Sequence, residues 1–319
     1  MPDKKNLESL YQSDLKPRLS ELDDQRIKVA TKVKKFAAFS IIPIGLSIFI
    51  SVNVTGDELP LLAAIGICVW IYFSKINPFW QDYRAKFKEQ VIRKIINFID
   101  DRFTYSPSKK ISLAEFKKTG IFLMGVDRYR GDDHIEGKID STHVEFSEVH
   151  AEYRTRDNKG RTNYHTIFKG LLFSADFNKN FNVKTYVLTD VAEKMFGFLG
   201  TKLQKMNKWR GQLVKLENIE FEKEFAVYSG DQVESRYILS PSLMERILSF
   251  KKQTKKRIQM SFVGTRLYVT VPYRKNLFEP KLFGDIVDFK NIQEYHDDLN
   301  LVLGLIQTLN LNTRIWSKK

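Results

Sequence analysis

The chain has 319 residues, a hydrophobic fraction of 43% and a net charge of +14 at pH 7. Its 24 Phe and 13 Tyr exclude an intrinsically disordered chain, because disordered segments are poor in aromatic residues. A single cysteine, Cys68, excludes an internal disulfide framework and a cysteine-rich zinc site. The positive charge favours anionic partners, such as phospholipid headgroups or nucleic acid.

Two adjacent segments, 36–56 and 59–74, contain no charged residue. A helix needs about 20 apolar residues to cross a bilayer, which the first segment provides and the second reaches by extending to Ile76. We therefore predict a transmembrane hairpin over 36–76; the alternative is an apolar hairpin inside a soluble core. Residues 1–35 are too charged and too long for the start of a signal peptide, so we expect no cleavable signal.

The charges that flank the hairpin predict its orientation. Basic residues stand before the first span and after the second, whereas the connection carries only Asp57 and Glu58. Positive flanks stay in the cytoplasm. We therefore expect a multi-pass protein of the inner membrane with both termini cytoplasmic.

Apolar stripes at helical spacing lie on both sides of the hairpin. The first, in the amphipathic segment 1–35, runs from Leu15 to Val33, and the second, in 77–102, runs from Trp80 to Phe98. Two arrangements remain open at this point. The two helices pair with each other as a stalk, or each packs on the domain that follows.

Residues 103–319 predict a cytosolic domain of short strands between turn signals. The strands are expected at Thr119–Val126, His134–Ile139, Thr142–Tyr153, His165–Phe177, Val183–Leu188, Gln212–Leu216, Glu224–Tyr228, Ser235–Leu239, Ile258–Val263 and Leu267–Tyr273. Apolar residues change parity within Thr142–Tyr153, which predicts a bulge near Ser147.

Three helices are expected within this domain. They begin near Asp190, at Ser240-Pro241 and shortly before Ile292, where a 3-4-3-4-3 stripe starts. Because strands and helices do not alternate regularly, the predicted class is α+β: a transmembrane helical hairpin, then a mainly antiparallel β-rich domain with a C-terminal helix.

Three stretches resemble a bacterial family known as domain of unknown function 3137 (DUF3137). They read FSEVHAEYR at 146–154, TIFKGLLFSADFNKNF at 166–181 and LENIEFEKEFAVYSGDQVESRYILSPSLMERI at 216–247, and Phe278-Glu279 is similar to a shorter shared element. The resemblance covers most of residues 100–310. It implies an N-terminal hairpin and a β-rich cytosolic part, with no activity or catalytic residues to carry over.

No motif for phosphate binding, dinucleotide binding or hydrolysis occurs, so we predict no catalytic residues, no cofactor and no metal. Four histidines, His134, His143, His150 and His165, match no ligand spacing and favour surface or strand-lining roles. The acidic cluster Asp127, Asp132, Asp133 and Glu136 permits a cation loop or a carboxylate pair, but a solvated β-turn is the preferred interpretation.

Two surfaces remain as candidate sites. Charged residues that interleave with aromatics between 217 and 237 predict either a partner-binding edge or a charged turn; they are Glu220, Glu222, Asp231, Glu234 and Arg236. A basic run after a predicted helix predicts either anionic-lipid contact or simple complementation of the helix end; it comprises Lys251, Lys252, Lys255, Lys256 and Arg257.

The leading hypothesis is a membrane-anchored module that binds a protein partner or its own copies at the inner membrane face. Its rivals are a membrane-bound enzyme with a dispersed site and an anionic-lipid sensor. Nucleic acid is disfavoured, because the basic run lacks interleaved aromatics.

Overall fold

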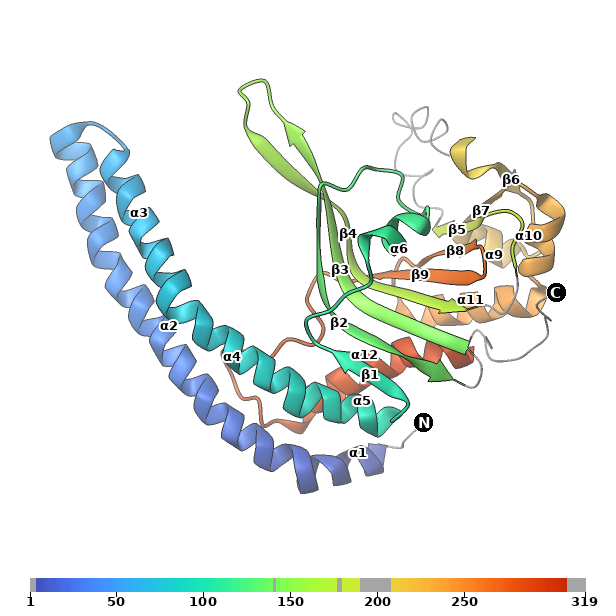
Figure 1. Cartoon of the computed structure of the whole chain (residues 1–319), viewed down its shortest axis with the longest axis horizontal. Coiled ribbons are helices and arrows are strands. Elements are labelled where there is room, and N and C mark those ends of the chain that lie inside the picture. The colour runs from blue at the N-terminus through green and yellow to red at the C-terminus, as the bar shows by residue number, and fades with distance from the viewer. Residues whose placement is uncertain (1–3, 140–141, 177–179, 190–207, 309–319) are drawn as a thin grey trace. The chain divides into compact units, whose positions relative to one another are not determined.

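A computed structural model describes residues 4–139, 142–176, 180–189 and 208–308 (Figure 1). The chain divides into two compact units. The stalk unit comprises residues 1–99 together with 278–296, and the sheet unit comprises 100–277 together with 297–319. The last helix, α12 (Phe289–Thr308), contributes to both units.

Two long helices form most of the stalk unit. The first combines α1 (Lys4–Leu10), a π-helical turn, α2 (Lys16–Ile50) and a second π-helical turn ending at Thr55. The second combines α3 (Leu59–Ile71), α4 (Asn77–Phe87) and α5 (Arg93–Ile99), again joined by π-helical turns. Between them the chain reverses at Gly56, which adopts the left-handed conformation that glycine tolerates at a helix end.

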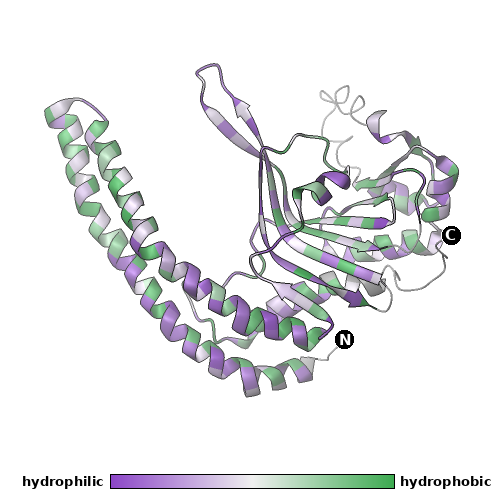
Figure 2. Ribbon diagram, viewed as in Figure 1, coloured by the Kyte–Doolittle hydropathy of each residue, from purple (hydrophilic) through white to green (hydrophobic). Residues whose placement is uncertain are grey.

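Both helices are long and apolar enough to cross a membrane, by length and composition. Figure 2 shows hydrophobic residues predominating along the end of α2 and along α3. Only 6% of the most apolar window of each helix is buried. Large side chains such as Phe39 and Trp70 are 70% and 66% exposed. A hairpin in a soluble core would have these side chains covered, so the exposure disfavours that alternative.

Beyond the apolar windows the two helices pack together and share a third element. Leu19 and Leu22 on α2 are fully buried, as is Val91 between α4 and α5. Residues 278–296 complete this core: the Tyr83 hydroxyl donates to the Lys281 carbonyl at 3.4 Å, and the rings of Phe87 and Tyr295 lie 5.7 Å apart. The predicted stripes therefore meet each other and also a segment from far along the chain.

The sheet unit is built on one antiparallel sheet of nine strands in the described residues. The order is β1-β2-β3-β4-β9-β8-β5-β7-β6. The strands are β1 (Phe103–Ser106), β2 (Arg128–Ile139), β3 (Thr142–Arg156), β4 (Thr162–Asp176), β5 (Thr185–Thr189), β6 (Gln212–Val214), β7 (Phe225–Ser229), β8 (Gln259–Val263) and β9 (Arg266–Pro272). With α12, this architecture confirms the predicted α+β class.

In the part of the chain that the structure describes, four α-helices lie between the strands. They are α6 (Leu113–Lys118), α9 (Ile219–Glu224), α10 (Gln232–Ile238) and α11 (Pro241–Thr254). Helix α11 begins where predicted, because the Ser240 side chain accepts the Leu243 N–H at its N-terminus. On α12, the predicted stripe residues Ile292 and Leu299 are fully buried.

Two predicted strands are wrong. Segment 119–126 is irregular, because Gly120 adopts a left-handed φ of +62° and the chain turns around it. Residues 235–238 belong to α10, whose start is capped by the Asp231 carboxylate, and Leu239 follows its end. The helix expected near Asp190 lies outside the described residues.

The predicted bulge in β3 is also corrected. The ladder shifts between Asp132 and Ile135 of β2, opposite Ser147, so the extra residue lies on the partner strand. Strand β3 instead buries both of its faces at different points. Val149 and Ala151 pack in a cluster with Phe116 of α6, whereas Val144 and Phe146 are buried on the opposite face.

Candidate functional site

The most distinctive surface of the sheet unit lies where edge strand β6 meets α10, which we call the β6–α10 surface. Large apolar side chains are exposed here: Leu213 on β6 is 43% exposed, Ile219 at the start of α9 is 71%, and Val233 and Tyr237 on α10 are 77% and 54%. Val233 and Tyr237 are four residues apart and share one helix face. Exposed apolar residues that gather in this way are typical of interaction surfaces.

A pocket of about 420 Å³ opens in the same surface. Its walls come from the loop before α9 and from the junction of α10 with α11; they are Leu216, Glu217, Asn218, Arg236, Leu239, Pro241 and Met244. Two hydrogen bonds hold α10 beside β6: Arg236 Nε donates to the Lys215 carbonyl at 3.2 Å, and Gln232 donates to Gln212 at 3.3 Å. The β6–α10 surface is therefore built from elements held in fixed positions, with a pocket between them.

Three of the five residues predicted as a binding edge hold the backbone of this surface in place. The Asp231 carboxylate accepts the N–H groups of Val233 and Glu234, which caps α10. The Glu234 carboxylate accepts the backbone N–H groups of Asn182 and Val183, each at 3.0 Å. The Glu222 carboxylate accepts the Leu216 N–H at 2.8 Å.

The other two lie at the surface. Arg236 is exposed and lines the pocket. Glu220 is exposed and forms a 2.7 Å ion pair with Lys252. Its pKa lies below the ordinary value because of the hydrogen bond from Lys252. These two residues place opposite charges near an apolar surface.

The residues of the predicted lipid-contact run, 251–257, have different local contacts. Lys251 pairs with Glu224, as Lys252 does with Glu220, so carboxylates of α9 balance two of the five charges. Lys255 ends α11 in a left-handed conformation with φ of 53°, and the Lys256 ammonium lies 4.1 Å from the centre of the Tyr273 ring. Arg257 is exposed. The run thus presents less uncompensated charge than its sequence indicates.

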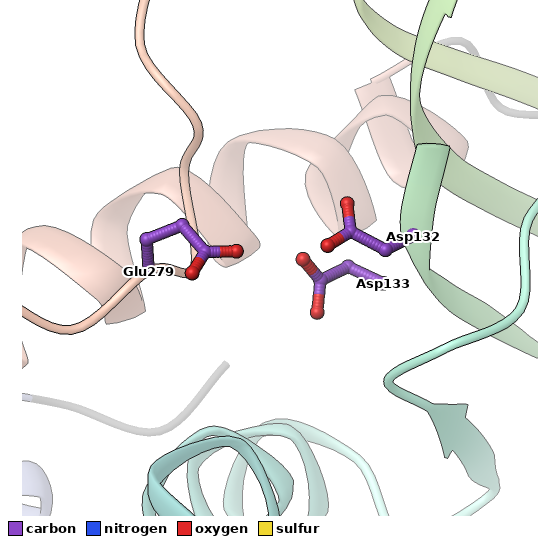
Figure 3. A group of neighbouring side chains, drawn as sticks. All are labelled: Asp132, Asp133 and Glu279. Carbon is purple, nitrogen blue, oxygen red and sulfur yellow. The ribbon is translucent and has the colours of Figure 1, made fainter. Parts of the chain in front are cut away.

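Three residues of the predicted acidic cluster, Asp132, Asp133 and Glu136, lie within strand β2, so the prediction of a solvated turn is wrong for them; Asp127 precedes the strand. Asp132 and Asp133 project from β2, as Figure 3 shows. Asp133 is fully buried at the strand irregularity with φ of 56°, and it accepts a hydrogen bond from the Tyr105 hydroxyl. Its buried, left-handed position fits a role in shaping the irregularity.

Three of the four histidines, His134, His150 and His165, contact different partners. His134 lies 3.3 Å from the Glu145 carboxylate, and this hydrogen bond holds the Glu145 pKa below its ordinary value together with Arg266. His150 contacts the Thr166 hydroxyl at 3.1 Å, and burial lowers its pKa. The His165 ring stacks on Tyr153 at 5.0 Å.

Sequence reasoning missed the role of Glu279, which is also labelled in Figure 3. Within the stalk unit its carboxylate accepts two hydrogen bonds from Arg84 and lies 2.9 Å from Lys88, whose side chain is 3% exposed. Burial raises the Glu279 pKa, but the two cations outweigh burial and the pKa is lowered overall. The neighbouring Phe278 is fully buried. The Phe278-Glu279 dipeptide therefore attaches the segment 278–296 to the stalk helices.

Comparison with known proteins finds a family of uncharacterised function that matches part of the chain. No curated protein matches. Among solved structures, the crystal structure of the mycobacterial trehalose monomycolate transport factor A, TtfA, aligns with 66% of this chain and 94% of that chain, at 9% identity and a TM-score of 0.32. A similarity this low carries no argument here. The model of the family described as "Protein of unknown function (DUF3137)" matches residues 166–311, which confirms the predicted resemblance over this segment; the stretch at 146–154 lies outside the match.

Proposed function

We propose that this protein is a membrane-anchored module that binds a protein partner through its β6–α10 surface at the cytoplasmic face of the inner membrane. The observation that carries the proposal is the exposed group Leu213, Ile219, Val233 and Tyr237 beside a pocket of about 420 Å³. This group lies in the stretch predicted as a binding edge.

The composition of the surface supports protein binding. Protein interfaces combine an apolar centre with a polar rim, and Tyr and Arg are enriched among the residues that dominate affinity. Here Val233 and Tyr237 supply the apolar centre, while Arg236, Glu217 and Glu220 supply charges at its edge. Strand β6 adds an exposed edge, because it pairs only with β7 among the described strands. Free edges recruit extended segments of partners.

The anchor supports the location. Two helices with apolar, uncovered windows lie in the stalk unit, and basic residues flank them on the side of both termini. A module tethered in this way meets membrane-associated partners at high local concentration, so modest contacts suffice for binding.

Photo-cross-linking in intact cells tests the proposal. A photoreactive amino acid at Val233, which is 77% exposed, should yield a discrete adduct. The same amino acid at Lys110, exposed elsewhere on the sheet unit, is the matched control and should not yield it. Tyr237→Ala should reduce the adduct about fivefold or more, because truncating a central interface residue costs more than about 1 kcal/mol.

The adduct also distinguishes two kinds of partner. An adduct of twice the mass of the chain identifies a second copy, and any other mass identifies a different protein. Identical adducts from positions 233 and 110, or an adduct insensitive to Tyr237→Ala, would contradict the proposed surface.

A further inference from the structure

A long β-hairpin extends from the sheet at the junction of β3 and β4 (Figure 1). Every residue from 154 to 166 is exposed, so this part of the hairpin is not buried against the rest of the sheet unit. The strands pair in register to the end, from Tyr153 opposite His165 to Arg156 opposite Thr162. We call residues 154–166 the arm.

The tip of the arm is ordered by its only carboxylate. Asp157 Oδ1 accepts the Lys159 N–H at 2.9 Å and the Arg161 N–H at 2.8 Å. Gly160 allows this tight turn with φ of +77°. An exposed hairpin with a fixed tip presents its side chains at defined positions, as a recognition element requires.

The arm is strongly basic. It carries four exposed cations, Arg154, Arg156, Lys159 and Arg161, against Asp157, whose carboxylate is engaged within the turn.

More basic residues lie at the base of the arm. Arg128 and Arg130 of β2 approach the single Glu152 carboxylate at 3.8 Å and 2.7 Å, and Arg128 also stacks 3.7 Å over the Tyr164 ring. Lys169 of β4 stands opposite His150. Because burial lowers the His150 pKa, this ring adds no charge near neutral pH. Positive potential therefore continues from the arm onto the sheet.

From this surface we propose that the arm binds anionic phospholipid headgroups. Guanidinium groups match the geometry of phosphate oxygens, and clustered basic residues concentrate at anionic membranes. The inference rests on the proposed membrane anchoring, because the tether keeps headgroups at high local concentration. The arm lacks the run of exposed aromatic rings on which a nucleic acid would stack; Tyr164 is 40% exposed and lies under Arg128.

The full chain in lipid nanodiscs provides the test. Cys68 is the only cysteine, so Cys68→Ala with Asn158→Cys allows one fluorophore at the tip of the arm. Discs of neutral lipid are compared with discs containing about a third anionic lipid, each with a quencher on a small fraction of headgroups. We expect severalfold stronger quenching in anionic discs, reversed by high salt because salt screens exposed charges.

Two variants with equal loss of charge decide which surface is responsible. Replacing Arg154, Arg156, Lys159 and Arg161 by Gln should reduce quenching to the level of neutral discs. Replacing Lys251, Lys252, Lys255 and Lys256 by Gln should leave it unchanged. All four arm cations are exposed, so the sheet should stay folded, which circular dichroism checks. Equal quenching in both discs, or loss only in the second variant, overturns the inference.

The remaining outcomes identify other ligands. Displacement of the arm by millimolar inorganic phosphate at matched ionic strength would show a soluble phosphate site and overturn the lipid assignment. RNA binding that depends on the same four cations, without headgroup quenching, would overturn it in favour of nucleic acid. A chain that fails to enter discs contradicts the proposed anchoring, whereas an inserted chain with an unquenched arm contradicts only this inference.

Discussion

At the scale of single residues, Glu279 forms ion pairs with Arg84 and Lys88 within the stalk unit. The Lys88 side chain is 3% exposed and that of Glu279 is 18% exposed, so the pair is well shielded from water. Removing one partner of a buried pair leaves the other charge without compensation, which is strongly destabilising. Glu279 should therefore control how firmly residues 278–296 stay attached to the stalk helices.

Glu279→Gln should destabilise the attachment of this segment by about 3 kcal/mol, because it removes the shielded carboxylate charge that binds Arg84 and pairs with Lys88. Hydrogen exchange of backbone amides in 280–296 measures the change and should accelerate about a hundredfold. Glu294→Gln, at an exposed position of the same segment, is the matched control and should leave exchange unchanged. Similar exchange in both variants would show that Glu279 does not fasten the segment.

The same carboxyl group predicts a pH dependence. The folded stalk unit lowers the Glu279 pKa from its ordinary value of 4.5, so the charged form is favoured in the folded state. Its stabilisation is therefore complete above the ordinary pKa and is lost as pH falls through the lowered value. The difference in thermal midpoint between wild type and Glu279→Gln should shrink as pH drops below about 4.5. A difference that is constant across this range would contradict the assignment.

At the scale of secondary-structure elements, the sequence of α10 contains two conflicting signals, one for a strand and one for a helix start. Tyr237 and Ile238 have high β-propensity, which favours a strand. Yet Asp231 with Glu234 three residues later is a helix start signal, and the structure uses Asp231 as the cap. Local capping chemistry outweighed β-propensity here, since propensity is a weak guide within one turn.

The cap leads to a prediction for the β6–α10 surface. Asp231→Ala should destabilise α10 by about 1 kcal/mol, because two N–H groups lose their acceptor. Asp231→Asn keeps an acceptor and should restore most of the loss. Cross-linking from Val233 should fall in the Ala variant and recover in the Asn variant. Equal cross-linking in the wild type and in both variants would show that binding at the β6–α10 surface does not depend on a well-ordered α10.

The strands with clear apolar runs between turn signals were predictable; β8 and β9, joined at Gly264, are examples. Strand β1 and helix α9 were not, because they have only four and six residues. The arginines at the base of the arm were missed for a different reason. Arg128 and Arg154 are distant in the sequence, and only the β2–β3 register brings them to one part of the sheet.

At the scale of the whole molecule, the segment 278–296 determines how much of the structure a fragment of the chain can retain. It belongs to the stalk unit although it follows the sheet in sequence. A fragment of residues 100–319 would keep the sheet strands but would leave this segment without α2, α4 and α5. No boundary in the sequence marks this return, because Phe278 and Ile292 look like ordinary core residues of the preceding domain.

We therefore expect the fragment 100–319 to retain the sheet while its residues 278–296 lose protection. Backbone amides of β3, β4 and β9 should exchange slowly, as in the full chain, and amides of 280–290 should exchange at close to unprotected rates. Full protection of 280–290 in the fragment would show that the segment does not depend on the stalk helices.

The central claim is that the two apolar helices anchor the sheet unit at the cytoplasmic face of a membrane, and cysteine accessibility tests it most directly. In a Cys68→Ala background, one cysteine is placed at Asp57 in the connection between the helices or at exposed Lys110 on the sheet unit. A membrane-impermeant maleimide applied to intact cells should label Asp57→Cys and should label Lys110→Cys only after the cells are permeabilised. Labelling of Lys110→Cys in intact cells, or recovery of the chain in the soluble fraction, would contradict the account.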